Sequence, residues 1–379
     1  MKRIYLDYAA TSPTDPEVLK AMEPYFFEKF GNSTSPHTIG REAQKAVEDA
    51  RQSLARLLNA QPQEIVFTSG ATESNNFAIF GVARALRSRG NHIIVSSIEH
   101  HSVLEPIRAL SQEGFEITYL PVNSFGRVDP QEVARAITPK TILTAVMMAN
   151  NEIGTIEPAA EIGTITRERK IPFLVDAVQA VGRMPVNVNQ LNCDLLSLSA
   201  HKFYGPKGVG ALYIRKDTAI EPFLLGGDQE RNRRASTQNV PGIVGLGKAV
   251  ELCQNQMIVE AQRQKDLRDK MIEYVLKNID GSRLNGHPTE RLAHNAHFSF
   301  ERIDGETLLT ALDMEGIAAS MGSACTSGAL EPSHVLRAIG LSDALALESL
   351  RVTIGRWTTQ QDVVFFLETL NEKIKKLRA

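Results

Sequence analysis

Short apolar runs alternate with helical stretches from about residue 64, and this alternation limits the possible folds more than any other feature of the chain. The runs span residues 64–67, 92–95, 116–120, 141–148, 172–175, 195–198 and 211–214. Such runs, each followed by a segment long enough for a helix, are typical of a mostly parallel β-sheet covered by helices on both faces. The pattern therefore predicts an α/β fold.

The alternation fades after about residue 245, where a long helical stretch begins. A chain of 379 residues is too long for one hydrophobic core, and its 42% of apolar residues can fill two. We expect a large domain over residues 16–250. Residues 1–15 and 251–379 should form a smaller α+β domain, with a strand near 296–300 and a terminal helix that begins at a capping box of Thr359 and Asp362.

Charge and hydropathy exclude several classes of partner. Lys and Arg total 42 against 44 Asp and Glu, so the net charge of −2 gives no general attraction to nucleic acid or to acidic membranes. Charge appears at once in Lys2 and Arg3, and no apolar run approaches the length of a signal peptide or a membrane span. We expect a cytoplasmic protein with no membrane contact and no direct nucleic-acid contact.

Chemically capable residues follow the predicted strands. Because ligands in open α/β sheets bind at the carboxyl ends of the strands, we expect five loops to converge on one crevice. The residues in question are Gly70-Ala71-Thr72, His100, Asn150-Asn151, Asp176 and Lys202.

Lys202 follows an apolar strand and is flanked by Ser199, His201 and the turn at 204–208. A lysine partly removed from water there would lose its proton readily, and it could bind a carbonyl cofactor covalently or act as a base. Asp176 leaves a buried strand, where a carboxylate needs a partner. That partner is either the protonated ring nitrogen of a pyridoxal cofactor or a nearby arginine.

Other candidates have a functional and a structural interpretation. Residues 70–75 form a strand-to-helix turn that can bind a phosphate or simply begin a helix. His100 or His101 could stack on an aromatic ring or be structural, and Gln179 could reach the phenolic oxygen of such a ring. Arg356 could bind a substrate carboxylate or form an ion pair between domains.

Three cysteines at irregular spacing, Cys193, Cys253 and Cys325, form neither a disulfide framework nor a zinc motif. Small residues surround Cys325 from position 318 to 329. This setting favours an exposed, reactive thiol over an inert loop cysteine, whereas Cys193 and Cys253 are interpreted as structural. A reactive thiol in the same chain as Lys202 indicates an enzyme that moves sulfur.

These segments, in this order, resemble the IscS/NifS-like cysteine desulfurases, which are fold-type I enzymes dependent on pyridoxal 5'-phosphate. The resemblance covers nearly the whole chain and rests on residues 5–11, 69–76, 150–154, 199–202 and 323–327. It implies a fold-type I transferase that converts L-cysteine to L-alanine and leaves the sulfur as a persulfide on Cys325, for iron-sulfur cluster assembly or other thiolation.

The resemblance also implies roles for single residues. Lys202 would hold the cofactor, His100 would stack on its ring and manage protons, and Asp176 would bind the ring nitrogen. The remaining cofactor contacts implied are Gln179, Asn151, Ala71, Thr72, Ser199 and His201, with Thr237 supplied by the other subunit of a homodimer. Arg356, Asn32 and Asn151 would contact the substrate.

The acceptor of the sulfur stays open between an iron-sulfur scaffold and a tRNA-thiolation protein. No resident metal is expected, although Cys325 could ligate a cluster shared with a scaffold. There are two departures from the family pattern. Met321 stands where relatives often have serine, which slightly alters the loop, and the chain ends soon after its terminal helix, which bears on the docking of a scaffold. The alternatives are another pyridoxal enzyme, namely an aminotransferase or a selenocysteine lyase, and a non-catalytic sulfur-relay scaffold.

Overall fold

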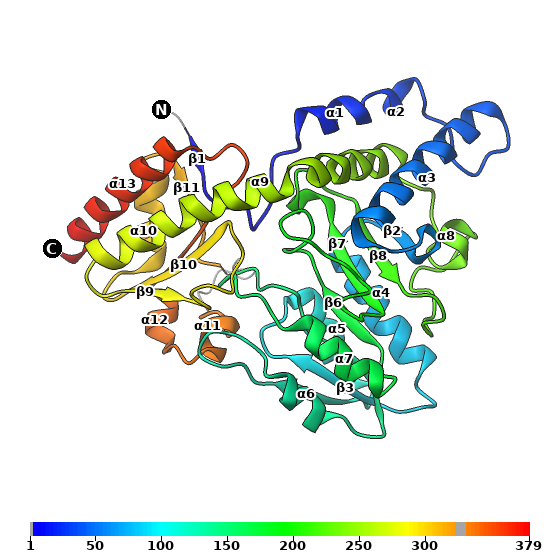
Figure 1. Ribbon diagram of the computed structural model, residues 1–379, viewed down its shortest axis with the longest axis horizontal. Coiled ribbons are helices and arrows are strands. Elements are labelled where there is room, and N and C mark those ends of the chain that lie inside the picture. The colour runs from blue at the N-terminus through cyan, green and yellow to red at the C-terminus, as the bar shows by residue number, and fades with distance from the viewer. Residues whose placement is uncertain (1–2, 323–330) are drawn as a thin grey trace.

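A computed structural model describes residues 3–322 and 331–379 (Figure 1). Its main sheet has seven strands in the order β2-β8-β7-β6-β5-β3-β4. The strands are β2 (Ile65–Thr68), β3 (His92–Ser96), β4 (Glu116–Leu120), β5 (Thr141–Ala145), β6 (Phe173–Asp176), β7 (Leu195–Ser199) and β8 (Gly210–Ile214). β8 is antiparallel to both of its neighbours, and all other pairs are parallel. The predicted α/β fold with a mostly parallel sheet is confirmed.

Helices bury both faces of this sheet because neighbouring residues of each strand point to opposite sides. Phe67, Ile94 and Val175 pack into one core with α3 and the first half of α9, whereas Val66, Ile93 and Leu174 pack into another with α4 and α5. The helices that accompany this sheet are α3 (Thr38–Leu58), α4 (Ala71–Ala85), α5 (His101–Gln112), α6 (Pro130–Ala136), α7 (Ala159–Glu168) and the first half of α9 (Val240–Asn278). Burial on both faces explains why the strands are almost continuously apolar.

A separate antiparallel sheet has the order β12-β10-β9, with β9 (Ser282–Asn285), β10 (Asn295–Phe300) and β12 (Ser349–Thr353). It shares a hydrophobic core with α10 (Gly305–Asp313), α13 (Gln360–Arg378) and the parallel pair of β1 (Ile4–Tyr5) and β11 (Ile317–Ala318). The predicted capping box is present, since Thr359 Oγ1 accepts from the Asp362 amide at 3.2 Å and Asp362 Oδ2 accepts from the Thr359 amide at 2.9 Å.

The long helix α9 (Val240–Asn278) joins the two parts and runs between them in Figure 1. Its residues up to Cys253 pack into the core of the main sheet, and those from Leu267 onward pack into the core of the small sheet. The predicted boundary at residue 250 falls inside this helix and stays a prediction.

The remaining short elements are α1 (Pro16–Met22), α2 (Pro24–Phe27), α8 (Gln229–Asn232), α11 (His334–Ala338), α12 (Asp343–Leu347) and the 3₁₀ turns η1 (Pro62–Glu64) and η2 (Ala200–Lys202). Of the helices in the described ranges, none is both long and apolar enough to cross a membrane.

Candidate active site

Lys202 lies in η2, directly after β7, and its Nζ donates to two backbone carbonyls of the N-terminal segment. The distances are 2.7 Å to Ala9 O and 2.8 Å to Ala10 O. Burial, together with the nearby cations Arg351 and Arg183, lowers the pKa of Lys202 to about 8. The chain therefore holds an amine that is easily made neutral, as a nucleophile or a base requires.

Asp176, at the end of β6, is buried and is held by amide donors. Its Oδ2 accepts from Asn75 Nδ2 at 2.8 Å, and its Oδ1 accepts from the Val178 amide at 3.0 Å. Within the part of the chain that the structure describes, no arginine or lysine forms an ion pair with Asp176. This geometry favours a cationic ligand over the alternative of a structural ion pair.

His100 is the N-cap of α5, and its Nδ1 lies 3.0 Å from the Ser102 amide and 2.9 Å from Ser102 Oγ. The residue is exposed in the single chain, yet partial removal from water lowers the pKa of His100 below its ordinary value. His101 instead points its ring towards His334, at a centroid distance of 5.1 Å.

Gln179 lies beside Lys202, since the side chains of both residues donate to the carbonyl oxygen of Ala9. Its Nε2 is 2.9 Å from Ala9 O, while its Oε1 is buried with no hydrogen-bond partner among the described residues. A buried amide oxygen without a partner costs free energy, so this atom is a candidate ligand contact.

The first turn of α4 offers free amides near η2. Its N-cap is Gly70, which has no side chain that could accept from the amides of the turn containing Ala71 and Thr72. Gly70 lies next to Ser199, since a Cβ placed on Gly70 would be 3.8 Å from Ser199 Oγ. The predicted phosphate contacts on the first turn of α4 and at the end of β7 are therefore neighbours. The helix start is therefore suited to an anion.

His201 completes this region of the crevice. Its Nδ1 is 3.0 Å from Thr11 Oγ1, and burial together with the Lys202 charge lowers its pKa to about 4. The ring is therefore neutral at ordinary pH and can only offer a hydrogen bond to an anion.

Thr237 and Asn32 are exposed in the single chain. The segment that carries Thr237 is tied to α4 by the Arg234–Glu73 ion pair, with Nε to Oε1 at 2.8 Å. Asn32 Oδ1 accepts from the Thr34 amide at 3.0 Å. Their roles stay predictions, because the implied role of Thr237 requires a second subunit.

Two arginines of the same region lie in different settings. Arg356 forms an ion pair with Asp15 and packs on the Tyr204 ring with its guanidinium carbon 4.3 Å from the centroid. This is an ion pair as in the structural alternative, although Asp15 and Arg356 both fall within the predicted small domain. Arg351 on β12 is buried and was missed from the sequence. It donates to Asn151 O at 3.1 Å and to Asp7 Oδ1 at 2.6 Å, and its charge acts on Lys202.

Cys325 lies outside the described residues, but the residues on each side of its segment are placed. Gly322 O accepts from Arg351 Nη1 at 3.2 Å, and Ser333 Oγ donates to Glu152 Oε2 at 2.5 Å. Arg351 also contacts Asn151, so residues 151–152 lie next to both ends of the segment.

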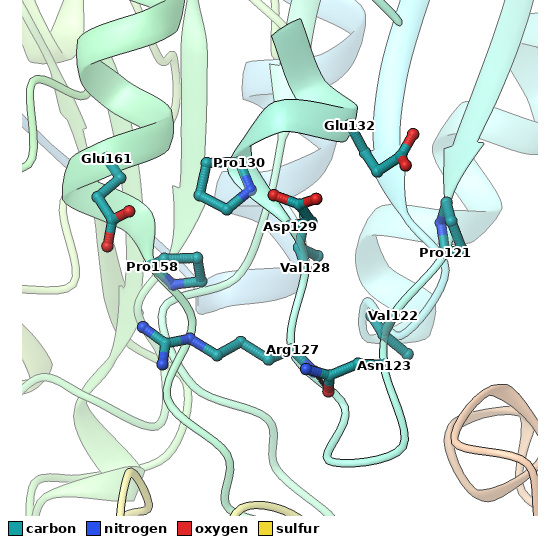
Figure 2. Close-up of a pocket in the computed structure, with 10 residues that line it drawn as sticks. All are labelled: Pro121, Val122, Asn123, Arg127, Val128, Asp129, Pro130, Glu132, Pro158 and Glu161. Atoms are coloured by element: carbon teal, nitrogen blue, oxygen red, sulfur yellow. Dashed lines mark hydrogen bonds between the residues drawn. The ribbon is translucent and has the colours of Figure 1, made fainter. Parts of the chain in front are cut away.

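A further pocket of about 550 Å³ lies beside α6 and α7. Figure 2 shows Arg127 extending from its loop towards Pro158 and Glu161, with Asp129 and Glu132 on the helical side. None of the residues that line it is a predicted site residue, and its mixed charge indicates no ligand class.

The fold and the crevice define an α/β transferase of fold-type I. Residues 4–366 match the aminotransferase class-V family, and the chain belongs to that family. It is 54% identical over 379 residues to a cysteine desulfurase IscS of Dictyoglomus turgidum, covering 100% of this chain and 96% of the relative.

Solved structures give the same result. A NifS-like protein superposes with a TM-score of 0.93 at 37% identity, covering 99% of this chain and 100% of that chain. A structure of SspA in complex with cysteine gives 0.84 at 36% identity, covering 94% and 100%. Within its family the chain is therefore a member of the IscS/NifS-like cysteine desulfurases.

Proposed function

We propose that this chain binds pyridoxal 5'-phosphate at Lys202, converts L-cysteine to L-alanine, and transfers the sulfur to Cys325. The proposal rests on two groups in one site: a lysine whose pKa is lowered to about 8, and a buried Asp176 that, within the described chain, accepts hydrogen bonds only from amides. Relatives that are named cysteine desulfurases, and one solved in complex with cysteine, support the choice of substrate.

The residues of the crevice fit this cofactor. The free amides of Ala71 and Thr72, with Ser199 and His201, would hold the phosphate, and Asp176 would bind a protonated ring nitrogen. The unpartnered Gln179 Oε1, or its amide turned over, would face the polar edge of the ring together with Asn151, and His100 would lie against its face. When bound, the cofactor supplies an electron sink for the carbanion formed at the substrate Cα.

The chain's own groups then act in order. Lys202 Nζ removes the Cα proton, which its lowered pKa permits near neutral pH. Arg351 or Arg356 would bind the substrate carboxylate, with Asn32 as a further contact. The thiolate of Cys325 attacks the substrate sulfur: an S–S bond forms, the Cβ–S bond breaks, and the electron pair passes to the carbon skeleton, which takes up a proton and leaves as L-alanine.

Partners remain part of the proposal. We infer a homodimer in which Thr237 serves the other subunit's phosphate, and delivery of the persulfide to an iron-sulfur scaffold or a tRNA-thiolation protein. Cys325 would be the residue that a shared cluster ligates. A cytoplasmic location remains a prediction from the sequence.

The test uses purified protein and two variants. Cys325→Ala should keep the visible absorbance of the bound cofactor but lose catalytic alanine formation, whereas Lys202→Ala should lose the normal absorbance. Cys193→Ala is the matched control, because burial raises the pKa of Cys193 to about 12 and keeps it unreactive. Normal turnover by Cys325→Ala would exclude the persulfide step, and absence of the absorbance from wild-type protein supplied with the cofactor would favour a non-catalytic relay.

An aminotransferase or a selenocysteine lyase needs no loop cysteine. Supplying L-cysteine and measuring alanine together with protein-bound persulfide separates these activities from the proposed one.

A further inference from the structure

A directed chain of hydrogen bonds joins Asp176 to His100 through two side chains that the proposed mechanism does not use. Asn75 Nδ2 lies 2.8 Å from Asp176 Oδ2 and 2.9 Å from Ser102 Oγ, and Ser102 Oγ lies 2.9 Å from His100 Nδ1. Asn75 is completely buried and Ser102 is 8% exposed. We propose that Asn75 and Ser102 are positioning residues that hold His100 as the neutral tautomer protonated at Nε2, so that the ring presents an N–H donor to the crevice.

The orientation of the Asn75 amide follows from its neighbour. Turned the other way, its carbonyl oxygen would face the Asp176 carboxylate, so the NH₂ group must point there. One hydrogen then binds Asp176 and the other binds Ser102 Oγ, which uses both donors of the amide. The Asn75 Oδ1 atom is left buried without a hydrogen-bond partner among the described residues, a cost that the two donated bonds must offset.

The direction of the remaining bonds is fixed by donors that cannot accept. Ser102 Oγ accepts from Asn75, so its hydrogen is free to point at His100 Nδ1. The Ser102 backbone amide, which can only donate, also lies 3.0 Å from the same Nδ1. Because two donors converge on Nδ1, that nitrogen must keep its lone pair, and the ring proton belongs on Nε2.

Taken together, burial and the charged groups around His100 lower its pKa and favour the neutral ring. Asp176 on β6 favours the imidazolium, whereas Lys202 in η2, His101 on α5 and His334 on α11 oppose it. Burial is the largest effect and lowers the pKa of His100. Glu99, the preceding residue, is itself buried, and burial raises its pKa well above the usual range.

The role of this tautomer in proton transfer rests on the proposed function, but the tautomer itself can be measured without turnover. Holoenzyme labelled with ¹⁵N-histidine would be titrated by NMR, with the His100 signals assigned by their loss in His100→Gln. In wild-type protein we expect Nδ1 to resonate as a non-protonated nitrogen and Nε2 as a protonated one. A protonated Nδ1 in the neutral ring would overturn the proposal, irrespective of the titration results for the Ser102 variants.

Ser102→Ala removes the hydroxyl donor and leaves the backbone amide. The titration midpoint of His100 should rise by on the order of half to one pH unit, since one hydrogen bond that disfavours the imidazolium is lost. Ser102→Thr, which keeps the hydroxyl, should restore the midpoint. Ser111→Ala on the same helix is the matched control, because Ser111 is exposed and donates only to Arg108 O.

An unchanged midpoint in Ser102→Ala would exclude the positioning role of that residue. Failure of the proposed function has a different signature, namely absence of alanine formation by a wild-type protein whose His100 shows the expected nitrogen signals.

Discussion

Lys202 should capture an aldehyde with a pH dependence that no surface lysine shares. Its pKa is lowered from the ordinary 10.5 to about 8. At pH 7 the neutral fraction of the amine is then about one in eleven, against about one in three thousand for an unperturbed lysine, which is a gain of roughly 300-fold in reactive amine. Since the neutral amine is the nucleophile, the rate of capture should rise tenfold per pH unit up to about pH 8 and then level off.

The assay mixes apo-protein with pyridoxal 5'-phosphate in a stopped-flow instrument from about pH 6 to pH 10 and follows the absorbance of covalent capture. Each rate constant is divided by that of a small primary amine in the same buffer, so that titration of the cofactor itself cancels. The ratio should be constant below about pH 8 and fall about tenfold per unit above it. Lys202→Met should abolish capture, and Lys216→Met, at an exposed lysine, should not change it.

The charge of Arg351 provides a second perturbation, because it is the largest coulombic influence that lowers the Lys202 pKa. Arg351→Gln should move the break in the ratio to higher pH, while Arg337→Gln, at an exposed arginine paired with Asp343, should leave it in place. A ratio that stays constant through pH 10 in wild-type protein would refute the reasoning, because it would mean that Lys202 titrates like a lysine in water.

Two further contacts can be tested by substitution. Ser333→Ala removes the donor to the buried Glu152 and the N-cap of α11, so it should lower the free energy of unfolding by about 1–3 kcal/mol and slow persulfide formation in a single turnover. Ser342→Ala removes only an exposed helix cap, so it should cost about 1 kcal/mol and leave the persulfide rate unchanged. Equal persulfide rates in the two variants would contradict this. Glu230→Leu removes the buried partner of Arg51 and leaves it only the partly exposed Glu48, so it should cost up to about 3–5 kcal/mol in urea unfolding. Adding Arg51→Met should recover part of this loss, and no recovery in the double variant would exclude the ion pair as the cause.

The main sheet could be predicted because its strands, apart from the partly exposed edge strand β4, are buried on both faces and therefore appear as mostly apolar runs. The direction of β8 could not, since a buried strand has the same pattern whether it runs parallel or antiparallel to its neighbours. In the small sheet only the apolar β10 was predicted. β9 and β12 contain Arg283 and Arg351 among their few residues, and this polarity hides them from a search for apolar runs.

The candidate site could be predicted where chemistry follows a strand directly, as at Asp176 and Lys202. Asn75, Ser102 and Arg351 were not assigned roles, because their partners are distant in sequence and only the fold brings them together. The sequence held one indication of the role of Arg351. A charged side chain inside a strand that packs on a hydrophobic core must have a partner, so an arginine at such a position is a candidate for a buried contact.

Asp176 and Lys202, which can carry opposite charges, have different kinds of hydrogen-bond partner. Asp176 receives N–H donors from Asn75 and Val178, which hold the carboxylate in place without adding a positive charge. Lys202 donates to two carbonyls, which hold the amine in place, whereas burial and two nearby arginine charges disfavour its proton. Had an arginine paired with Asp176 instead, the carboxylate would have been neutralised by the protein. Because only amides bind it among residues 3–322 and 331–379, its charge remains available to a cationic ligand. The amine that must react with that ligand is easily deprotonated.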